Sequence, residues 1–275
     1  MATVVELICY PIKGCAGTSC DRALLTPAGL AHDRAFMVVD ADGVFRTQRR
    51  DPQLALIRPE IDAGGERLTL RRPGADPVTI DVDTSGPRRD VHLFGNPFRG
   101  IDQGDAAAHW LSQALGADSR LVRVPPEHER VTDGAIPGTA GYADSSPLHV
   151  LSRTSLDLLN ARLGEGGAPS LPMARFRPNV VVEGWADPHT EDRVRRCTVG
   201  EAELGYAKLA IRCAVTLVDQ DTGTRAGPEP LRTFAGYRRA PQGGVAFGGK
   251  FAVLRPGKVA VGDELVVTEW GTAEL

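Results

Sequence analysis

Short strand-like stretches, each closed by a turn former, follow one another through the first hundred residues. "TVVELICY" ends at Pro11 and "DRALLT" ends at Pro27, and further stretches of this kind lie at 54–62, 67–74, 78–83 and 89–95. "RAFMVVDADGVFRTQR" has apolar residues on both sides of an Asp42-Gly43 turn, which predicts a hairpin. Spacing of roughly ten residues between strands is typical of barrels. The N-terminal part is therefore predicted to be β-rich and barrel-like.

A second part begins after residue 124. "GDAAAHWLSQALG" (104–116) predicts a helix with Asp105 as N-cap and Gly116 as stop, and a strand at 119–124 follows. Residues 125–141 are rich in Pro and Gly and show no periodicity, so we place the domain boundary there, with domains 1–124 and 125–275. Beyond it we expect a helix at 152–164, a short helix within 228–238, and strands at 148–152, 178–184, 197–219, 251–255, 258–262 and 264–270. The chain is predicted to be α+β and dominated by antiparallel strands.

Composition excludes several function classes. The formal net charge of −3 and the pI near 6.1 give no overall basic field for nucleic acid or a membrane surface. No apolar run is long enough to span a bilayer and no signal-peptide pattern is present, so we expect a cytoplasmic protein. Five cysteines, an odd number, predict reduced thiols rather than a disulfide framework. The six histidines stand apart, which argues against a zinc site.

Familiar catalytic motifs are also absent. The sequence has no G-x-S-x-G, no G-x-x-x-x-G-K-[ST] and no G-x-G-x-x-G at the start of a helix. "GGVAFGGK" (243–250) is glycine-rich, and we expect a flexible turn there rather than a phosphate cradle.

Three basic stretches stand next to turn formers. "YPIKG" carries Lys13, one of only four lysines, "HDRAFMVVD" carries Arg34, and "RFRPNVVV" carries Arg175, Arg177 and Asn179. Guanidinium groups bind phosphate bidentately and lysine adds a point charge, so together these side chains predict an anion site. Cys213, in "LAIRCAVTLVDQDTG", has no cysteine or histidine near it in sequence. On its own it is either a buried small hydrophobe in a strand or a reactive thiolate.

The order of these motifs resembles a known family. "YPIKG", "HDRAFMVVD", "RFRPNVVVEG", "RCAVTLVDQDTG", "EPLRTFAGYRR" and "GKVAVGDELVV" occur as they do in MOSC-domain proteins, from about residue 4 to about residue 268. The similar subgroup has an N-terminal β-barrel domain and includes the mitochondrial amidoxime-reducing components and their bacterial relatives. The resemblance implies an N-terminal MOSC β-barrel-like domain (1–124) packed on a mixed β-barrel MOSC domain (125–275) with a few helices.

The resemblance also implies a site for the molybdenum cofactor, Mo-molybdopterin. By it, Cys213 is the metal ligand and a catalytic residue, and a soft thiolate suits a sulfur-rich metal site. Arg212 would favour the thiolate and reach the anionic end of the cofactor. Asp144 is the second catalytic candidate, able to orient a basic residue or a substrate nitrogen. The remaining cofactor-binding residues implied are Lys13, Arg34, Ser145, Ser146, Arg177 and Asn179.

The implied function is reduction of N-hydroxylated small molecules. The chain has no plant-type C-x₄-C-x₂-C run, so we expect electrons from a separate flavin, ferredoxin or b-type cytochrome protein. One alternative is a sulfur-carrier or cofactor-handling protein that uses Cys213 as persulfide or ligand. Another is a binding module or a non-reductive relative acting on a specialised metabolite.

Overall fold

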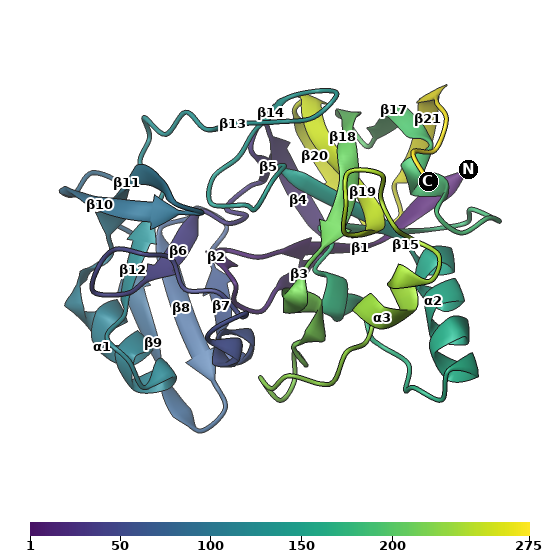
Figure 1. Cartoon of the computed structure of the whole chain (residues 1–275). Coiled ribbons are helices and arrows are strands. Elements are labelled where there is room, and N and C mark those ends of the chain that lie inside the picture. Colours follow the sequence, from purple (N-terminus) through teal and green to yellow (C-terminus); the bar gives the residue numbers. More distant parts are fainter.

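The computed structural model describes residues 1–275 and consists of two β-rich halves placed side by side (Figure 1). One half is built on an eight-stranded sheet, and the pairing of β16 with β1 closes seven of its strands into a barrel. In sheet order these strands are β16 (Val180–Glu183), β15 (Leu148–Ser152), β19 (Val245–Arg255), β18 (Ala202–Arg212), β17 (Val194–Val199), β21 (Glu264–Trp270) and β1 (Ala2–Cys9), with β3 (Thr18–Cys20) attached to β1. Only β15 and β16 run parallel.

Alternating apolar residues fill the barrel. Nineteen buried side chains form its core, and they include Val4 and Leu7 of β1, Tyr206 of β18 and Phe251 of β19. A second cluster lies between the barrel and two helices, α2 (Arg153–Glu165) and α3 (Leu231–Ala235). Ser152 caps α2 by accepting a hydrogen bond from Ser155 N. No helix combines the length and the apolar character needed to cross a membrane.

The other half contains two smaller sheets and one helix. A five-stranded sheet has the order β10 (Arg88–Leu93), β11 (Asn96–Asp102), β12 (Arg120–Arg123), β6 (Phe36–Val39) and β2 (Ile12–Lys13). A three-stranded sheet contains β7 (Arg58–Ile61), β8 (Arg67–Arg72) and β9 (Ala75–Asp81). Helix α1 (Gly104–Leu115) ends at the left-handed Gly116, as predicted, and buries Trp110 in the core of this half. Its N-cap is Gln103 rather than Asp105.

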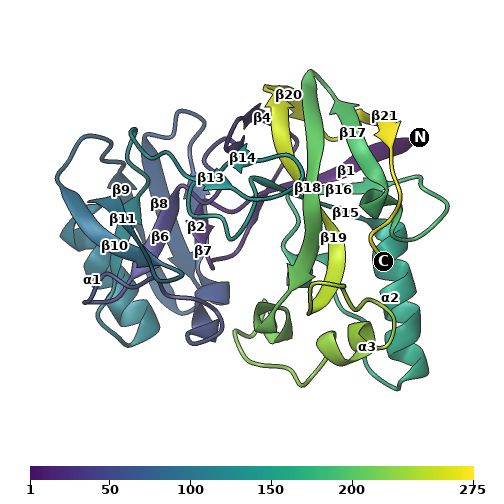
Figure 2. The same ribbon diagram turned by 45° about the horizontal axis from the view of Figure 1, so that its top comes forward.

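The chain crosses between the halves more than once. Strands β1 and β3 come from the start of the sequence but lie in the large sheet, and β4 (Arg22–Thr26) pairs with β5 (Gly29–Leu30) and with the distant β20 (Gly257–Ala260). Two further short strands, β13 (Val131–Thr132) and β14 (Gly138–Thr139), lie in the Pro- and Gly-rich segment. Figure 2 shows both chain ends on the barrel side, the N-terminus beside β21 and the C-terminus near α2. Strands β1 and β21 pair with each other. The α+β, β-rich class is confirmed.

Besides the N-cap of α1 at Gln103, four local predictions were wrong. Residues 214–217 form a 3₁₀ turn rather than strand, because the Cys213 carbonyl accepts from Thr216 N and turns the chain. Residues 52–56 also form a 3₁₀ turn, started by Pro52. The second arm of the 34–49 hairpin forms no strand and makes only isolated bridges, one between Phe45 and Val39 and one between Val44 and His92.

The fourth is "GGVAFGGK", of which only the first two glycines form a turn; the rest belongs to β19. Gly248 has φ +86°, and a Cβ there would lie 2.5 Å from His149 Nε2. The glycines therefore allow β19 to form a bulge and to pack closely on β15.

Candidate functional site

A single cavity at the junction of the halves brings the predicted site residues together. All nine line it: Cys213, Asp144, Lys13, Arg34, Ser145, Ser146, Arg177, Asn179 and Arg212. Its walls come from the 13–14 and 34 region, the 45–49 loop, the 143–149 segment, residues 176–179, the end of β18 and Lys250 of β19. Segments distant in sequence thus converge on one pocket, whereas Arg175, also considered for the anion site, does not line it.

Cys213 follows the last residue of β18 and is half-buried. Its Sγ accepts a hydrogen bond from Arg49 Nη1 at 3.7 Å. Arg212, expected to act on the thiolate, instead donates Nη2 to the Phe176 carbonyl at 2.9 Å and keeps an unpaired buried Nε. The direct donor to the sulfur comes from the N-terminal half, and the sequence analysis gave Arg49 no role although it ends the stretch "RAFMVVDADGVFRTQR".

Hydrogen bonds to the Asp219 carboxylate hold the turn after Cys213 in place. Asp219 Oδ1 accepts from Thr222 N at 2.9 Å and from Thr222 Oγ1 at 3.0 Å, so these two residues shape the turn. Arg175 Nη2 donates to Asp219 Oδ2 at 2.9 Å and is buried. The role of Arg175 is therefore to hold the segment that carries the cysteine.

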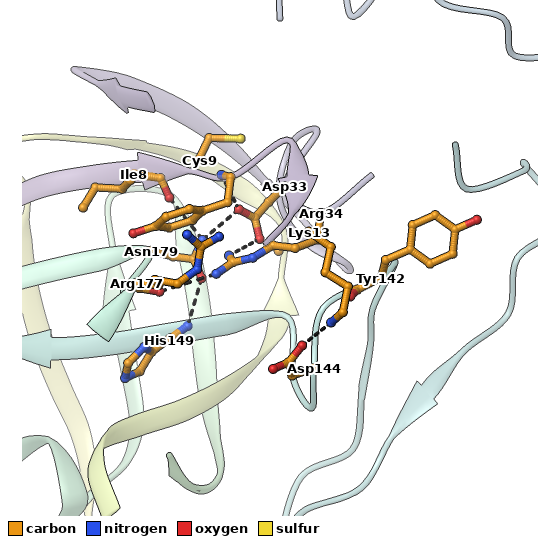
Figure 3. A network of polar contacts seen from close by, with 12 residues as sticks. Ile8, Cys9, Lys13, Asp33, Arg34, Tyr142, Asp144, His149, Arg177 and Asn179 are labelled. Atoms are coloured by element: carbon orange, nitrogen blue, oxygen red, sulfur yellow. Dashed lines mark hydrogen bonds and ion pairs between the residues drawn. The ribbon is translucent and has the colours of Figure 1, made fainter. Parts of the chain in front are cut away.

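A buried network positions the two arginines expected at the anion end (Figure 3). Asp33 is buried and accepts from Tyr10 N at 2.8 Å, Asn179 Nδ2 at 3.0 Å and Arg34 Nη1 at 2.5 Å. Asn179 also donates to Ile8 O and accepts from His149 N through Oδ1. The Asn179 amide is thus hydrogen-bonded to β1, to β15 and to Asp33. Because Asp33 in turn accepts from Arg34, Asn179 helps to position Arg34.

Arg34 and Arg177 share further features. Their guanidinium carbons lie 4.3 and 4.2 Å from the centroid of the Tyr10 ring, within cation–π range. Both have left-handed backbones, with φ of 47° and 56°. Non-glycine residues adopt this conformation at some cost, and such strain collects at binding sites.

Lys13 and Asp144 form an ion pair in the same cavity (Figure 3). Lys13 also donates to the Tyr142 carbonyl at 2.9 Å and lies 4.8 Å from the centroid of the Phe94 ring. Burial would raise the pKa of the Asp144 carboxyl, but the Lys13 ammonium outweighs burial and holds that pKa below its usual value. Burial lowers the pKa of Lys13 and the Asp144 charge opposes this. Asp144 therefore orients a basic residue, one of the two roles the sequence suggested.

Ser145, Ser146 and His149 complete this wall. Ser146 Oγ donates to the Ser145 carbonyl at 2.7 Å. His149 is buried, and its Nε2 lies 3.2 Å from the Phe247 carbonyl, which assigns the proton to Nε2 and leaves Nδ1 without a partner. Burial, with Lys250 and Arg212 nearby, lowers the pKa of His149 well below its usual value, so the ring is neutral.

The cavity carries a large excess of positive charge. Seven cationic side chains line it against one carboxylate: Lys13, Arg34, Arg46, Arg49, Arg177, Arg212 and Lys250 against Asp144. Lys13, Arg34 and Arg46 are ion-paired, whereas the other four have no carboxylate partner. Burial and the neighbouring guanidinium groups of Arg212 and Arg34 lower the pKa of Lys250 to about 7.

The four unpaired cations are half-buried and face one cavity, and such a cluster favours binding of an anion, because partly desolvated like charges are costly without a counter-charge. The only sulfur that lines the cavity is Cys213; Cys9, Cys15, Cys20 and Cys197 lie elsewhere. One cysteine, four unpaired cations and the unused Arg212 Nε donor fit a group that combines a soft metal with an anionic phosphate.

Comparisons with known proteins agree with this arrangement. The model of the MOSC N-terminal beta barrel domain matches residues 1–118, and that of the MOSC domain matches residues 137–266. Mitochondrial amidoxime reducing component 2 of Rattus norvegicus is 33% identical over 285 residues, covering 96% of this chain and 82% of that protein. Mitochondrial amidoxime-reducing component 1 of Homo sapiens is 31% identical over 283 residues, with 96% and 82% covered.

A molybdenum cofactor sulfurase is also similar. The protein from Anopheles gambiae is 34% identical over 255 residues, which cover 84% of this chain but 32% of the sulfurase. The two domain matches and the similarity along almost the whole chain confirm the resemblance seen in the sequence: this chain belongs to the family of MOSC-domain proteins that carry an N-terminal MOSC β-barrel domain.

Proposed function

We propose that this protein is a molybdenum-cofactor-dependent oxidoreductase that reduces N-hydroxylated small molecules with electrons from a separate redox protein. The observation that carries the proposal is the cavity itself, in which one half-buried cysteine and four unpaired cations face the same space. The amidoxime-reducing components, similar over 96% of the chain, support the choice of substrate class.

Each part of the chain has a distinct task in this proposal. Cys213 supplies the protein thiolate to the metal, and Arg49 holds its sulfur in place. Arg34, Arg177, Arg212 and Lys13 bind the pterin and its phosphate, with Ser145 and Ser146 beside them. Asp33 and Asn179 orient Arg34, and Asp144 orients Lys13. The bound cofactor supplies a redox-active Lewis acid for breaking an N–O bond.

The proposal includes a flavin, ferredoxin or b-type cytochrome protein as electron donor and a cytoplasmic location. It also includes the division into domains 1–124 and 125–275, with the first strand contributed to the second domain's barrel.

Metal analysis with a matched cysteine control tests the proposal. Protein from a cofactor-competent host should contain about one molybdenum per chain and reduce benzamidoxime to benzamidine with a reduced viologen dye as donor. Cys213→Ala should lose both metal and activity, because no second thiolate lines the cavity. Cys20→Ala, outside the cavity, should keep both. Equal reduction by wild type and Cys213→Ala would show the assignment to be wrong.

The similarity to molybdenum cofactor sulfurases favours a second candidate, a cofactor-handling protein in which Cys213 carries a persulfide. The same preparations separate the two. Metal-free protein with a mass increase of one sulfur atom, lost in Cys213→Ala, supports the carrier function. Stoichiometric metal with turnover supports the reductase.

A further inference from the structure

Lys250 is a cavity residue to which the proposed function assigns no task. It stands in β19, where it pairs with His149 of β15 on one side and with Lys208 of β18 on the other. Its side chain lines the cavity that contains Cys213 and forms none of the ion pairs of the structure. Lys208 does not line the cavity, and its ammonium group pairs with the Asp133 carboxylate at 2.5 Å.

Reduction of an N–O bond needs a proton donor, and the other titratable side chains of the cavity are poor donors. Asp144 is held as a carboxylate by Lys13, and Lys13 is bound to it. His149 is neutral, and its one N–H faces the Phe247 carbonyl. Arginine does not release its proton at neutral pH. Lys250 alone combines an exchangeable proton with the lack of a fixed partner.

The surroundings of Lys250 suit such a donor. His149 faces it from β15, Arg212 from the end of β18, and Arg34, Asp33 and Asp144 from the loops above. Burial and the two arginines lower the pKa of Lys250 to about 7, and the two more weakly acting carboxylates oppose them. A donor works best when its pKa lies near the operating pH.

We propose that Lys250 is a catalytic residue that donates a proton to the oxygen leaving the N-hydroxylated substrate, an inference that rests on the proposed function. The substrate N–O bond breaks, two electrons from the separate redox protein reduce the substrate, and oxygen leaves as water. Lys250 supplies one of the two protons, solvent supplies the other, and the neutral amine of Lys250 is then reprotonated from solvent.

The pH profile of kcat is the first test. Benzamidoxime reduction by the molybdenum-loaded protein, with a reduced viologen as donor, should fall about tenfold per pH unit above the pKa of Lys250. That pKa can be measured directly in the same loaded protein by ¹³C NMR after reductive methylation, because the chain has only four lysines. The signal missing from Lys250→Arg assigns the peak. The NMR titration and the alkaline limb should coincide to within about half a pH unit.

Two variants separate proton donation from simple charge. Lys250→Met should lower kcat about 100-fold per bound molybdenum, remove the alkaline limb and change KM little. Lys250→Arg keeps the cation but not the exchangeable proton, so it should lose kcat to a similar extent. Lys258→Met, an exposed lysine far from Cys213 in the fold, is the matched control and should behave as wild type.

Wild-type kcat in Lys250→Arg would overturn the inference, since charge alone would then suffice. An unchanged alkaline limb in Lys250→Met would do so as well, while the proposed function would stand. Absence of any reduction by wild-type protein that contains molybdenum would overturn the proposed function, and this inference with it.

Discussion

At the residue scale, the contact between Arg49 and Cys213 is the one most open to direct test. The Arg49 guanidinium donates to Sγ from the other half of the molecule. Hydrogen bonds from charged donors are worth about 1.5–3 kcal/mol, and this one is made to the sulfur that reacts. Arg49→Met should therefore slow the reaction of Cys213 with a disulfide reagent about tenfold at pH 7 in cofactor-free protein.

The other cysteines give a low background in this assay. Burial raises the pKa of Cys15 and of Cys197 to about 12, and it also raises the pKa values of Cys9 and Cys20. The reaction rate of Cys213→Ala measures the background from the other four cysteines. Arg50→Met is the matched control, because Arg50 is exposed and donates to the Phe45 carbonyl instead. If Arg49→Met and Arg50→Met react at the same rate, Arg49 does not support the thiolate.

Single residues also show what the sequence predicts well and what it does not. The nine expected site residues converge on one cavity because each belongs to a distinctive family motif. Arg49 ends the family motif that begins at "HDR" (32–49) but was assigned no role, and Lys250 carries no such signal. Arg49 stands among several arginines, and Lys250 stands in a glycine run that was expected to be a turn. Their importance comes from chain crossings and a bulged register that local patterns do not encode.

At the element scale, the junction between β15 and α2 is a point where one side chain supports several others. Ser152 accepts from Ser155 N and donates to Glu191 Oε2 at 3.0 Å, and Ser155 Oγ donates to Glu191 Oε1 at 2.8 Å. All three residues are buried. Ser152→Ala removes the helix cap and a donor to a buried carboxylate, so we expect a loss of about 2–3 kcal/mol in the free energy of unfolding.

Chemical denaturation measures this loss. Asp157→Ala, an exposed position on the same helix, serves as the control and should change stability by less than about 0.5 kcal/mol. A Ser152→Ala variant as stable as this control would contradict the role of the cap and of the Glu191 cluster.

Helices and strands were predicted correctly where helix caps and apolar periodicity point to the same conformation. They were missed where contacts between distant segments determine the conformation. Helices α1 and α2 have caps and apolar periodicity, and both occur close to their predicted limits. Residues 214–217 are β-branched or apolar and were expected to continue a strand. They turn instead because the segment is tied down by Thr216 and by the Arg175–Asp219 pair. This turn places Cys213 at the end of β18, at the cavity wall.

At the scale of the whole molecule, barrel closure depends on pairs that no local pattern reveals. β1 joins β16 and β21, elements more than 170 residues away. The sequence therefore predicted the β-rich class correctly, but not that the first strand completes a barrel made of C-terminal strands. This crossing matters for function, because Lys13 in β2 comes soon after β1 and Arg34 lies between β5 and β6, and both line the cavity.

Cations from both halves of the molecule line the cavity, so we expect an anion bound there to stabilise the whole fold. Arg49 comes from one half, whereas Arg177, Arg212 and Lys250 come from the other, and without an anion these four cations have no carboxylate partner. A ligand that binds only the folded state at 100 times its Kd stabilises it by about 2.7 kcal/mol. For a chain of this size, this corresponds to a rise in Tm of roughly 5–10 °C.

Cofactor-free protein should show this rise in low-millimolar pyrophosphate relative to sodium chloride at equal ionic strength. Such concentrations are too low for general salt effects on apolar burial to dominate. Arg177→Met should abolish most of the rise, because its guanidinium has no carboxylate partner and is free to bind the anion. Arg58→Met, exposed and outside the cavity, should keep it. An equal rise in both variants would mean that pyrophosphate acts elsewhere on the surface and that the cationic cavity is not an anion site.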